Sequence, residues 1–146
     1  MKGTKKLAWL GLLLVLPVLA QATTVTYSAL TVRELGNFLM NLPTGFYAIA
    51  PAAAKNMMDT VDVFILDVRE PNEFAAERIQ GPVNIHIRDL PKRLGELPKG
   101  KPIIVYCKVG HRGSMAMMFL RGQGYNVQSI SGGLDGWKNA GLPVVK

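Results

Sequence analysis

The sequence predicts an α/β domain in which a parallel β-sheet is flanked by helices on both faces. From residue 61 onward, short apolar runs alternate with stretches of helical character, and this alternation is typical of α/β folds. The apolar runs are rich in branched side chains, as expected for strands buried on both faces of a parallel sheet. The length of 146 residues leaves room for one such domain and a leader, given about 100 to 200 residues per domain.

Residues 1–22 are typical of a signal peptide. They combine a basic start, an apolar run and a small-x-small cleavage site, formed by Lys2, Lys5 and Lys6, residues 7–19, and Ala20-Gln21-Ala22. A membrane-spanning helix needs about 18 or more apolar residues, and Pro17 interrupts this shorter run. We therefore expect cleavage before Thr23 and export to the periplasm or the medium, with an uncleaved membrane anchor as the alternative.

Residues 23–45 are interpreted as an N-terminal helical extension packed on the domain, which itself covers residues 46–146. Thr31 is expected to cap a helix that runs to about Met40, because Glu34 completes a capping box with it. The sequence does not indicate a function for this extension.

Within the domain, the pattern predicts the order of strands and helices. Strands are expected at the four apolar runs, which are residues 63–66, 83–85, 103–106 and 127–130. Helices are expected at residues 51–58, where proline suits the first turn, and at residues 71–76, 90–97 and 114–123. In the last helix Met115, Met118 and Phe119 share one face. These methionines, together with Met117, are therefore interpreted as core residues and not as metal ligands.

Charge and cysteine content exclude several classes of protein. The formal net charge is +7, and removal of the leader leaves 14 basic residues against 10 acidic ones, a charge of +4. No dense Lys/Arg run is interleaved with aromatic residues, so nucleic-acid binding is set aside. The single cysteine excludes an internal disulfide, so the stability of the domain must come from its core.

Cys107 is the candidate nucleophile, because it directly follows the strongest strand run and precedes a glycine-containing loop and a helix. Ligands of open α/β sheets bind at the carboxyl ends of strands, and the amides at a helix start form an anion site. Lys108, His111 and Arg112 add positive charge, which stabilises a thiolate. Gly110 lets the loop curl so that successive amides surround the sulfur. The alternative is an inert cysteine that fills core space at the strand end.

The segment Cys107 to Arg112 resembles the active-site loop of the rhodanese family, in which a cysteine and an arginine separated by four residues open a helix. Three further stretches are similar to signatures of that family and occur in the same order. They are Asp67-Val68-Arg69-Glu70 with Glu73-Phe74, then Gly81 with Asn84-Ile85, and finally Ser131-Gly132-Gly133 with Trp137. The resemblance covers about Phe46 to Val145.

This resemblance implies a five-stranded, mainly parallel sheet and a ping-pong sulfurtransferase reaction that needs no metal or organic cofactor. Cys107, as a thiolate, would attack the outer sulfur of thiosulfate or a related sulfane donor, and cyanide or another thiol would then remove that sulfur. The loop would bind the anionic donor through backbone amides and through three of its side chains. The implied substrate-binding residues are Lys108, Val109, Gly110, His111, Arg112 and Gly113.

Other residues are expected to support this site. Asp67 and Arg69 are expected to pair with each other at the end of a strand and fix the neighbouring loops, with contact to the substrate as the alternative. A turn and a core anchor are expected at Gly132, Gly133 and Trp137. Gly113 departs from the family pattern, because a serine or threonine commonly follows the loop arginine and donates its hydroxyl to the sulfur. Ser114 lies one position later, about 100° further round a helix. We therefore expect the persulfide to rely on backbone donors.

Two other functions stay open. Phosphatases and arsenate reductases on the same scaffold resemble this site but carry five residues between cysteine and arginine, whereas the four residues here should form a tighter ring that suits a single sulfur. A periplasmic sulfur carrier that hands a persulfide to one partner protein would have the same sequence features. The expected partners are a small-molecule sulfur donor and acceptor or a thiol-bearing protein, with membrane contact only if the leader is uncleaved.

Overall fold

The computed structural model describes residues 29–42 and 48–146. The chain divides into two units, Met1–Asn41 and Leu42–Lys146. The signal peptide predicted for residues 1–22 lies outside the described residues, and packing of the N-terminal extension on the domain stays a prediction. Within the two described ranges, every helix is too short or too polar to cross a bilayer.

The first unit contains the helix α1 (Ala29–Met40). This helix ends at Met40, as expected, but it begins before Thr31. The prediction that Thr31 caps α1 is therefore wrong. Alanine and leucine are strong helix formers, and Ala29 and Leu30 carry the helix past the threonine toward the N-terminus.

The second unit contains a fully parallel sheet, as the sequence predicts. Its described strands are β1 (Phe64–Asp67), β2 (Val83–Asn84), β3 (Ile103–Tyr106) and β4 (Val127–Ser129). The spatial order is β2-β1-β3-β4, and all three neighbouring pairs run parallel. The carboxyl ends of the strands therefore lie along one edge of the sheet, where Cys107 follows β3.

The sheet has four strands in the described part of the chain, where five were implied by the family resemblance. A fifth position is reduced to a single parallel bridge between Ile49 and Ile130. The Ile49 amide donates to the carbonyl of Ser129 at 2.8 Å, and the Ser131 amide donates to the carbonyl of Ile49 at 2.9 Å. The bridge is short because Pro51 begins a helix almost at once, and proline is well suited to that position.

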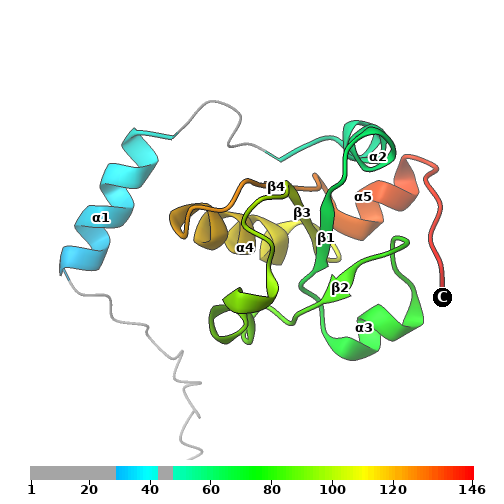
Figure 1. Ribbon diagram of the computed structural model, residues 1–146. Coiled ribbons are helices and arrows are strands. Elements are labelled where there is room, and N and C mark those ends of the chain that lie inside the picture. Colours follow the sequence, from blue (N-terminus) through cyan, green and yellow to red (C-terminus); the bar gives the residue numbers. More distant parts are fainter. Residues whose placement is uncertain (1–28, 43–47) are drawn as a thin grey trace, which may run out of the picture. The chain divides into compact units, whose positions relative to one another are not determined.

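Helices cover both faces of this sheet (Figure 1). On one face α4 (His111–Gly122) contacts β3 and β4. On the other, α2 (Pro51–Thr60) contacts α5 (Gly133–Asn139), and a core cluster joins residues from these two helices to β3. The helix α3 (Pro71–Ala76) has the predicted bounds, whereas α2 continues beyond the predicted end at residue 58.

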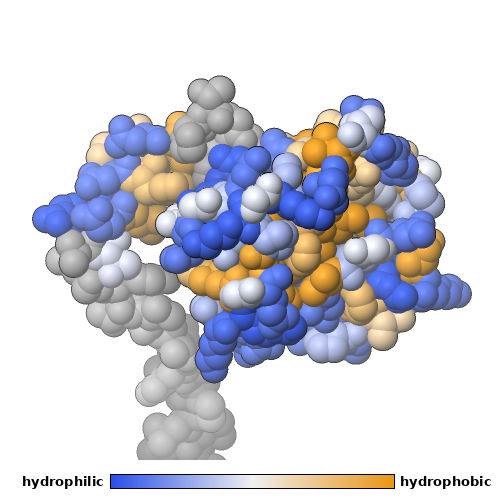
Figure 2. All heavy atoms as spheres, in the orientation of Figure 1, coloured by the Kyte–Doolittle hydropathy of each residue, from blue (hydrophilic) through white to orange (hydrophobic). Residues whose placement is uncertain are grey.

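The helix α4 turns a different face to the sheet than the sequence pattern predicts. Its buried residues are Gly113, Ala116, Met117 and Leu120, whereas Met115 and Met118 are 55% and 37% exposed. The prediction that Met115 and Met118 pack in the core is wrong, and that for Met117 is confirmed. Small residues at two buried positions let α4 approach the strands closely. On the viewed face of the molecule, apolar surface remains between charged groups (Figure 2).

The helix predicted over residues 90–97 is replaced by two 3₁₀ turns, η1 (Leu90–Lys92) and η2 (Leu94–Glu96). Pro91 has no amide hydrogen to donate, and Gly95 is a poor helix former. A continuous α-helix is therefore disfavoured, and the segment keeps only single turns.

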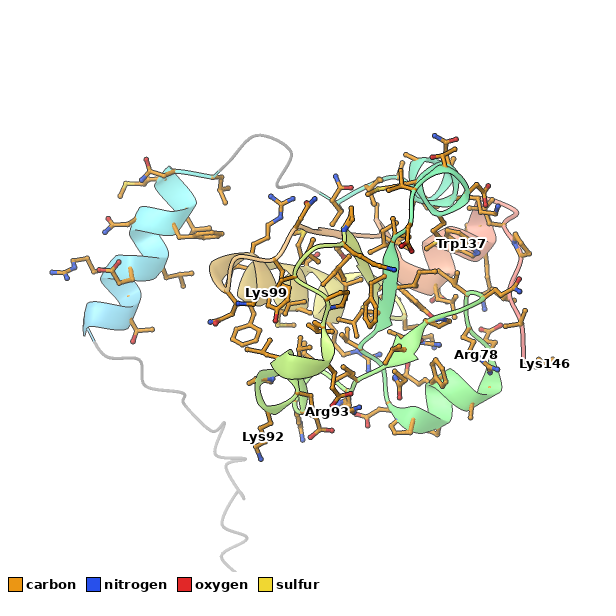
Figure 3. All side chains as sticks on the ribbon, in the orientation of Figure 1. Arg78, Lys92, Arg93, Lys99, Trp137 and Lys146 are labelled. Carbon is orange, nitrogen blue, oxygen red and sulfur yellow. The ribbon has the colours of Figure 1, made fainter. Side chains whose placement is uncertain are left out.

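Trp137 of α5 is the core anchor that the sequence predicts. Its side chain is fully buried, and its indole Nε1 donates to the carbonyl of Pro143 at 2.8 Å. Figure 3 shows Trp137 within the body of this unit and Arg78 close to the carboxyl terminus. There an antiparallel bridge joins Arg78 to Val145, so the last residues of the chain are held against the segment that follows α3.

Candidate functional site

Cys107 directly follows β3, at the edge of the sheet where the carboxyl ends of the strands lie. The start of α5 holds this part of the chain in place. The Leu134 amide donates to the carbonyl of Cys107 at 2.8 Å, and the Asp135 amide donates to that of Lys108 at 2.9 Å. The backbone of Cys107 and of the residue that follows it is thus fixed by the first turn of a neighbouring helix.

Gly110 allows the tight turn between the cysteine and α4. It has a φ of 103°, a conformation that glycine adopts without steric cost. The helix accordingly begins at His111, earlier than the predicted start at residue 114. Gly133 makes close contact from α5: a Cβ built there would overlap the carbonyl oxygen of Cys107 and would lie 2.8 Å from the Gly110 nitrogen.

One backbone amide contacts the sulfur. The Gly110 N–H donates to Cys107 Sγ at 3.2 Å. Within residues 48–146, the other amides of the loop and of the first turn of α4 have no backbone acceptor, namely those of Lys108, Val109, His111, Arg112 and Gly113. Unpaired amides at a helix start attract anions. The arrangement can therefore stabilise negative charge on Cys107 or on an atom bonded to it.

Cys107 itself is only 1% exposed, so solvent reaches little of the thiol in the resting protein. A hollow of about 190 Å³ lies beside the loop. It is lined by Arg69, Glu73, Ala76, Glu77, Lys108 and Leu134. Because Lys108 is the neighbour of Cys107 in the chain, this hollow is the candidate binding place for a small sulfur compound.

Arg112 is bound to a carboxylate from α3. Its Nη1 and Nη2 donate to Glu73 Oε2 and Oε1 at 2.8 and 3.0 Å, and both side chains are about a quarter exposed, at 28% and 24%. The hydrogen bonds from Arg112 lower the pKa of Glu73. The same bonds raise the pKa of Arg112, and Cys107 adds to this effect. Arg112 therefore remains charged next to the sulfur while Glu73 holds its position.

Lys108 is a cation of the loop and lines the hollow. It forms no ion pair with a carboxylate among residues 48–146. The nearby Glu77 is bound to Lys138. The pKa of Glu77 is lowered first by its hydrogen bond with Lys138, and the charge of Lys108 contributes to the same shift. Lys108 is thus free to attract an anion, a role that the sequence suggested equally for His111 and Arg112.

Asp67 and Arg69 form the buried pair that the sequence predicts. Arg69 Nη2 donates to Asp67 Oδ2 at 2.6 Å and to the carbonyl of Glu77 at 2.7 Å. Burial acts to lower the pKa of Arg69, but the hydrogen bonds and charge of Asp67 outweigh it and raise the pKa. The Asn84 side chain donates to the carbonyls of Asp67 and Arg69 at 3.0 and 3.1 Å. This network fixes the end of β1 beside the hollow.

Two other predicted residues of the loop are exposed. Val109 is 47% exposed, and His111 is the exposed first residue of α4. The sequence did not identify Glu73 as a site residue. Glu73 belongs to one of the stretches that resemble family signatures, and its carboxylate completes a capping box by accepting a hydrogen bond from the Glu70 amide at 3.1 Å. These signals account for the start of α3, but they do not indicate that Glu73 binds Arg112 of α4.

Comparisons with known proteins agree with this geometry. A family model described as the rhodanese-like domain matches residues 50–140. A sulfurtransferase of Allochromatium vinosum is 34% identical over 93 residues, covering 63% of this chain and 87% of that protein. The thiosulfate sulfurtransferase GlpE of Actinobacillus succinogenes is 35% identical over 100 residues, covering 68% of this chain and 90% of that protein. A crystal structure of a rhodanese-related protein from Thermoplasma volcanium superposes with a TM-score of 0.64 at 32% identity, covering 68% of this chain and 97% of that one.

Proposed function

Because the chain belongs to the rhodanese-like domain family, we propose that it transfers a sulfane sulfur from thiosulfate or a related donor to a thiophilic acceptor, carrying it as a persulfide on Cys107. The observation that supports this most directly is the hydrogen bond from the Gly110 amide to Cys107 Sγ at 3.2 Å, within a loop whose neighbouring amides have no backbone acceptor in the described part of the domain.

In the first half-reaction the Cys107 thiolate attacks the outer sulfur of thiosulfate. A sulfur–sulfur bond forms to Cys107 while the sulfur–sulfur bond of thiosulfate breaks, and sulfite leaves with the electron pair of that bond. The terminal sulfur of the persulfide then carries the negative charge. It lies about 2 Å from Sγ, the length of a sulfur–sulfur bond, and the unpaired amides of the loop are available to donate to it.

In the second half-reaction a nucleophile removes the terminal sulfur. Cyanide or a thiolate attacks that sulfur, its bond to Cys107 Sγ breaks, and the thiolate of Cys107 is restored with the bonding electrons. The product is thiocyanate or a new persulfide. Atoms and charge balance without a metal or an external oxidant or reductant.

The charged side chains take separate roles in this proposal. Lys108 attracts the anionic donor to the hollow, because its charge is not neutralised by a carboxylate in an ion pair of the described domain. Arg112 keeps the loop in shape through Glu73 and adds positive charge near the sulfur. Asp67 and Arg69 fix the end of β1 through their hydrogen bond to each other.

Intact-mass measurement before and after incubation with thiosulfate tests the proposal. We expect the protein to gain the mass of one sulfur atom, to lose it on addition of cyanide, and to release thiocyanate. Cys107→Ser should do none of these while keeping the circular dichroism spectrum of the wild type. Thiocyanate formation by Cys107→Ser at the wild-type rate would refute the proposal.

We also propose that the protein works outside the cytoplasm, on the basis of the residue pattern in positions 1–22. The same intact-mass measurement on protein expressed with its full N-terminus tests this. Cleavage predicts a chain that begins at Thr23, whereas a mass that includes Lys2 and the apolar run would refute cleavage.

A further inference from the structure

Ser129, the last residue of β4, has a buried hydroxyl with no hydrogen-bond partner among the described residues. The residue is 0% exposed, so water does not reach it from the surface. An unpaired buried hydroxyl destabilises the folded protein, and native structures contain few of them, so each one calls for an explanation, of which a catalytic role is one. An alanine at this position would have no hydroxyl to bury and would avoid this loss of stability.

The unpaired hydroxyl lies next to the loop that carries the sulfur. A Cβ built on Gly113 would lie 2.7 Å from Ser129 Oγ and 3.5 Å from the Cys107 nitrogen. Ser129 pairs in register with Val105 of β3, two positions before Cys107. The hydroxyl of β4 therefore lies against Gly113 in the first turn of α4, a position that also adjoins the backbone of Cys107.

Gly113 has no side chain, and this leaves room for the Ser129 hydroxyl. Gly113 is buried on the face of α4 that meets the sheet, and any larger residue would have to displace the Ser129 hydroxyl. The nitrogen of Gly113 also belongs to the amides that have no backbone acceptor within residues 48–146. The Gly113 amide and the Ser129 hydroxyl are thus two neighbouring donors, the first without a backbone acceptor and the second without a hydrogen-bond partner among the described residues.

We propose that the Ser129 hydroxyl is a hydrogen-bond donor for the sulfur of Cys107 in its persulfide form. This inference rests on the proposed sulfurtransferase function. In the resting protein Cys107 presents one sulfur, and Gly110 donates to it. Persulfide formation adds a second, negatively charged acceptor, and rotation of the serine side chain about its Cα–Cβ bond turns the hydroxyl from Gly113 toward the sulfur pair. A hydroxyl hydrogen reorients freely to suit a new acceptor, and bonds to charged acceptors are the stronger ones.

The experiment compares Ser129→Ala with a matched control, Ser114→Ala, which removes an exposed hydroxyl one residue after Gly113. Persulfide formation from thiosulfate and loss of the sulfur in buffer are followed by intact mass, and unfolding in urea is followed by circular dichroism. We expect Ser129→Ala to unfold at the same or a higher urea concentration than the wild type, because its hydroxyl has no partner in the resting state. Its persulfide should form about tenfold more slowly or decay about tenfold faster, the effect of one hydrogen bond to a charged group. Ser114→Ala should match the wild type.

A second variant keeps the test decisive. Gly113→Ala retains the serine but displaces its hydroxyl, so it should slow the formation of the persulfide. The double variant, Gly113→Ala with Ser129→Ala, should be no slower than Ser129→Ala alone. Wild-type rates of persulfide formation and decay in Ser129→Ala would overturn the role of Ser129. A lower stability of Ser129→Ala would also overturn it, because this would show that the hydroxyl is hydrogen-bonded in the resting state. If the wild type itself gains no sulfur, the proposed function fails first, and that result is distinct from either of these.

Discussion

The Arg112 guanidinium makes two hydrogen bonds to the carboxylate of Glu73, which is 39 residues away in the sequence. The same carboxylate caps the start of α3 by accepting from the Glu70 amide. One side chain therefore ties the first turns of α3 and α4 together beside the sulfur. This places Arg112 as a positioning residue for the loop, and it leaves Lys108 to meet an incoming anion.

Glu73→Gln should loosen the loop. The substitution removes the charge that binds Arg112 while keeping the shape of the side chain, and we expect a loss of about 1 kcal/mol in the free energy of unfolding and a several-fold lower rate of persulfide formation. Urea unfolding and intact-mass kinetics provide the measurements. Glu96→Gln is the matched control, because Glu96 accepts two similar hydrogen bonds from Arg93 in an exposed pair. Equal kinetic effects of the two substitutions would contradict the role of Glu73.

The Glu73–Arg112 pair also predicts a pH dependence. Arg112 lowers the pKa of Glu73 from its ordinary value of 4.5 in the folded protein, so ionisation of this carboxyl favours folding. Its contribution is fully present above that ordinary value and is lost as the pH falls through the lowered pKa. The difference in unfolding free energy between wild type and Glu73→Gln should therefore be constant near neutral pH and shrink below about pH 4.5. A difference that grows on acidification would contradict this assignment.

Lys108→Gln should weaken the binding of anionic donors. Loss of a charge at the hollow removes attraction for thiosulfate, so we expect KM to rise about fivefold, equivalent to about 1 kcal/mol, with a smaller change in kcat. The effect should diminish at high ionic strength because salt screens exposed charges. Lys101→Gln is the control, since Lys101 precedes β3 and lies at the opposite end of that strand from Cys107. A fall in kcat with an unchanged KM would refute the binding role.

Gly133→Ala should disturb the loop from the side of α5. Both Gly133 and Gly141 have positive φ values, of 59° and 72°, and alanine at either position costs about 1–2 kcal/mol. Only at Gly133 would the new Cβ also overlap the carbonyl of Cys107, with Gly110 N at 2.8 Å, whereas nothing lies within 4 Å at Gly141. We expect persulfide formation to fall by at least about tenfold in Gly133→Ala and to be retained in Gly141→Ala. Circular dichroism at low temperature identifies the folded fraction of each variant, so that rates are compared per folded molecule.

Trp137→Ala should cause a large loss of stability. The indole is fully buried and donates to the carbonyl of Pro143, and removal of a large buried aromatic side chain costs about 3–5 kcal/mol. Met115→Ala serves as the comparison, because Met115 is 55% exposed and surface substitutions change stability by about 0.5 kcal/mol or less. Urea unfolding of both variants measures the difference, and a loss of less than about 1 kcal/mol in Trp137→Ala would contradict the anchoring role.

The sequence by itself determined the strands, the α/β class and the place of Cys107. These features depend on local pattern. A short run of branched apolar residues such as Ile103 to Tyr106 favours a strand buried on both faces of a sheet, and a cysteine that follows such a strand directly lies at its carboxyl end. The turn at Gly110 could also be predicted from local sequence, because a positive φ is a property of a single residue.

Only the tertiary structure decided which groups lie around the loop that carries Cys107. The buried face of α4, the binding of Arg112 to Glu73 and the position of the Ser129 hydroxyl against Gly113 join residues far apart in the chain. Each depends on how closely a helix packs on the sheet and at what rotation. Residue periodicity shows which side chains are apolar, but it does not fix that distance or rotation, because they result from the packing of all the layers at once.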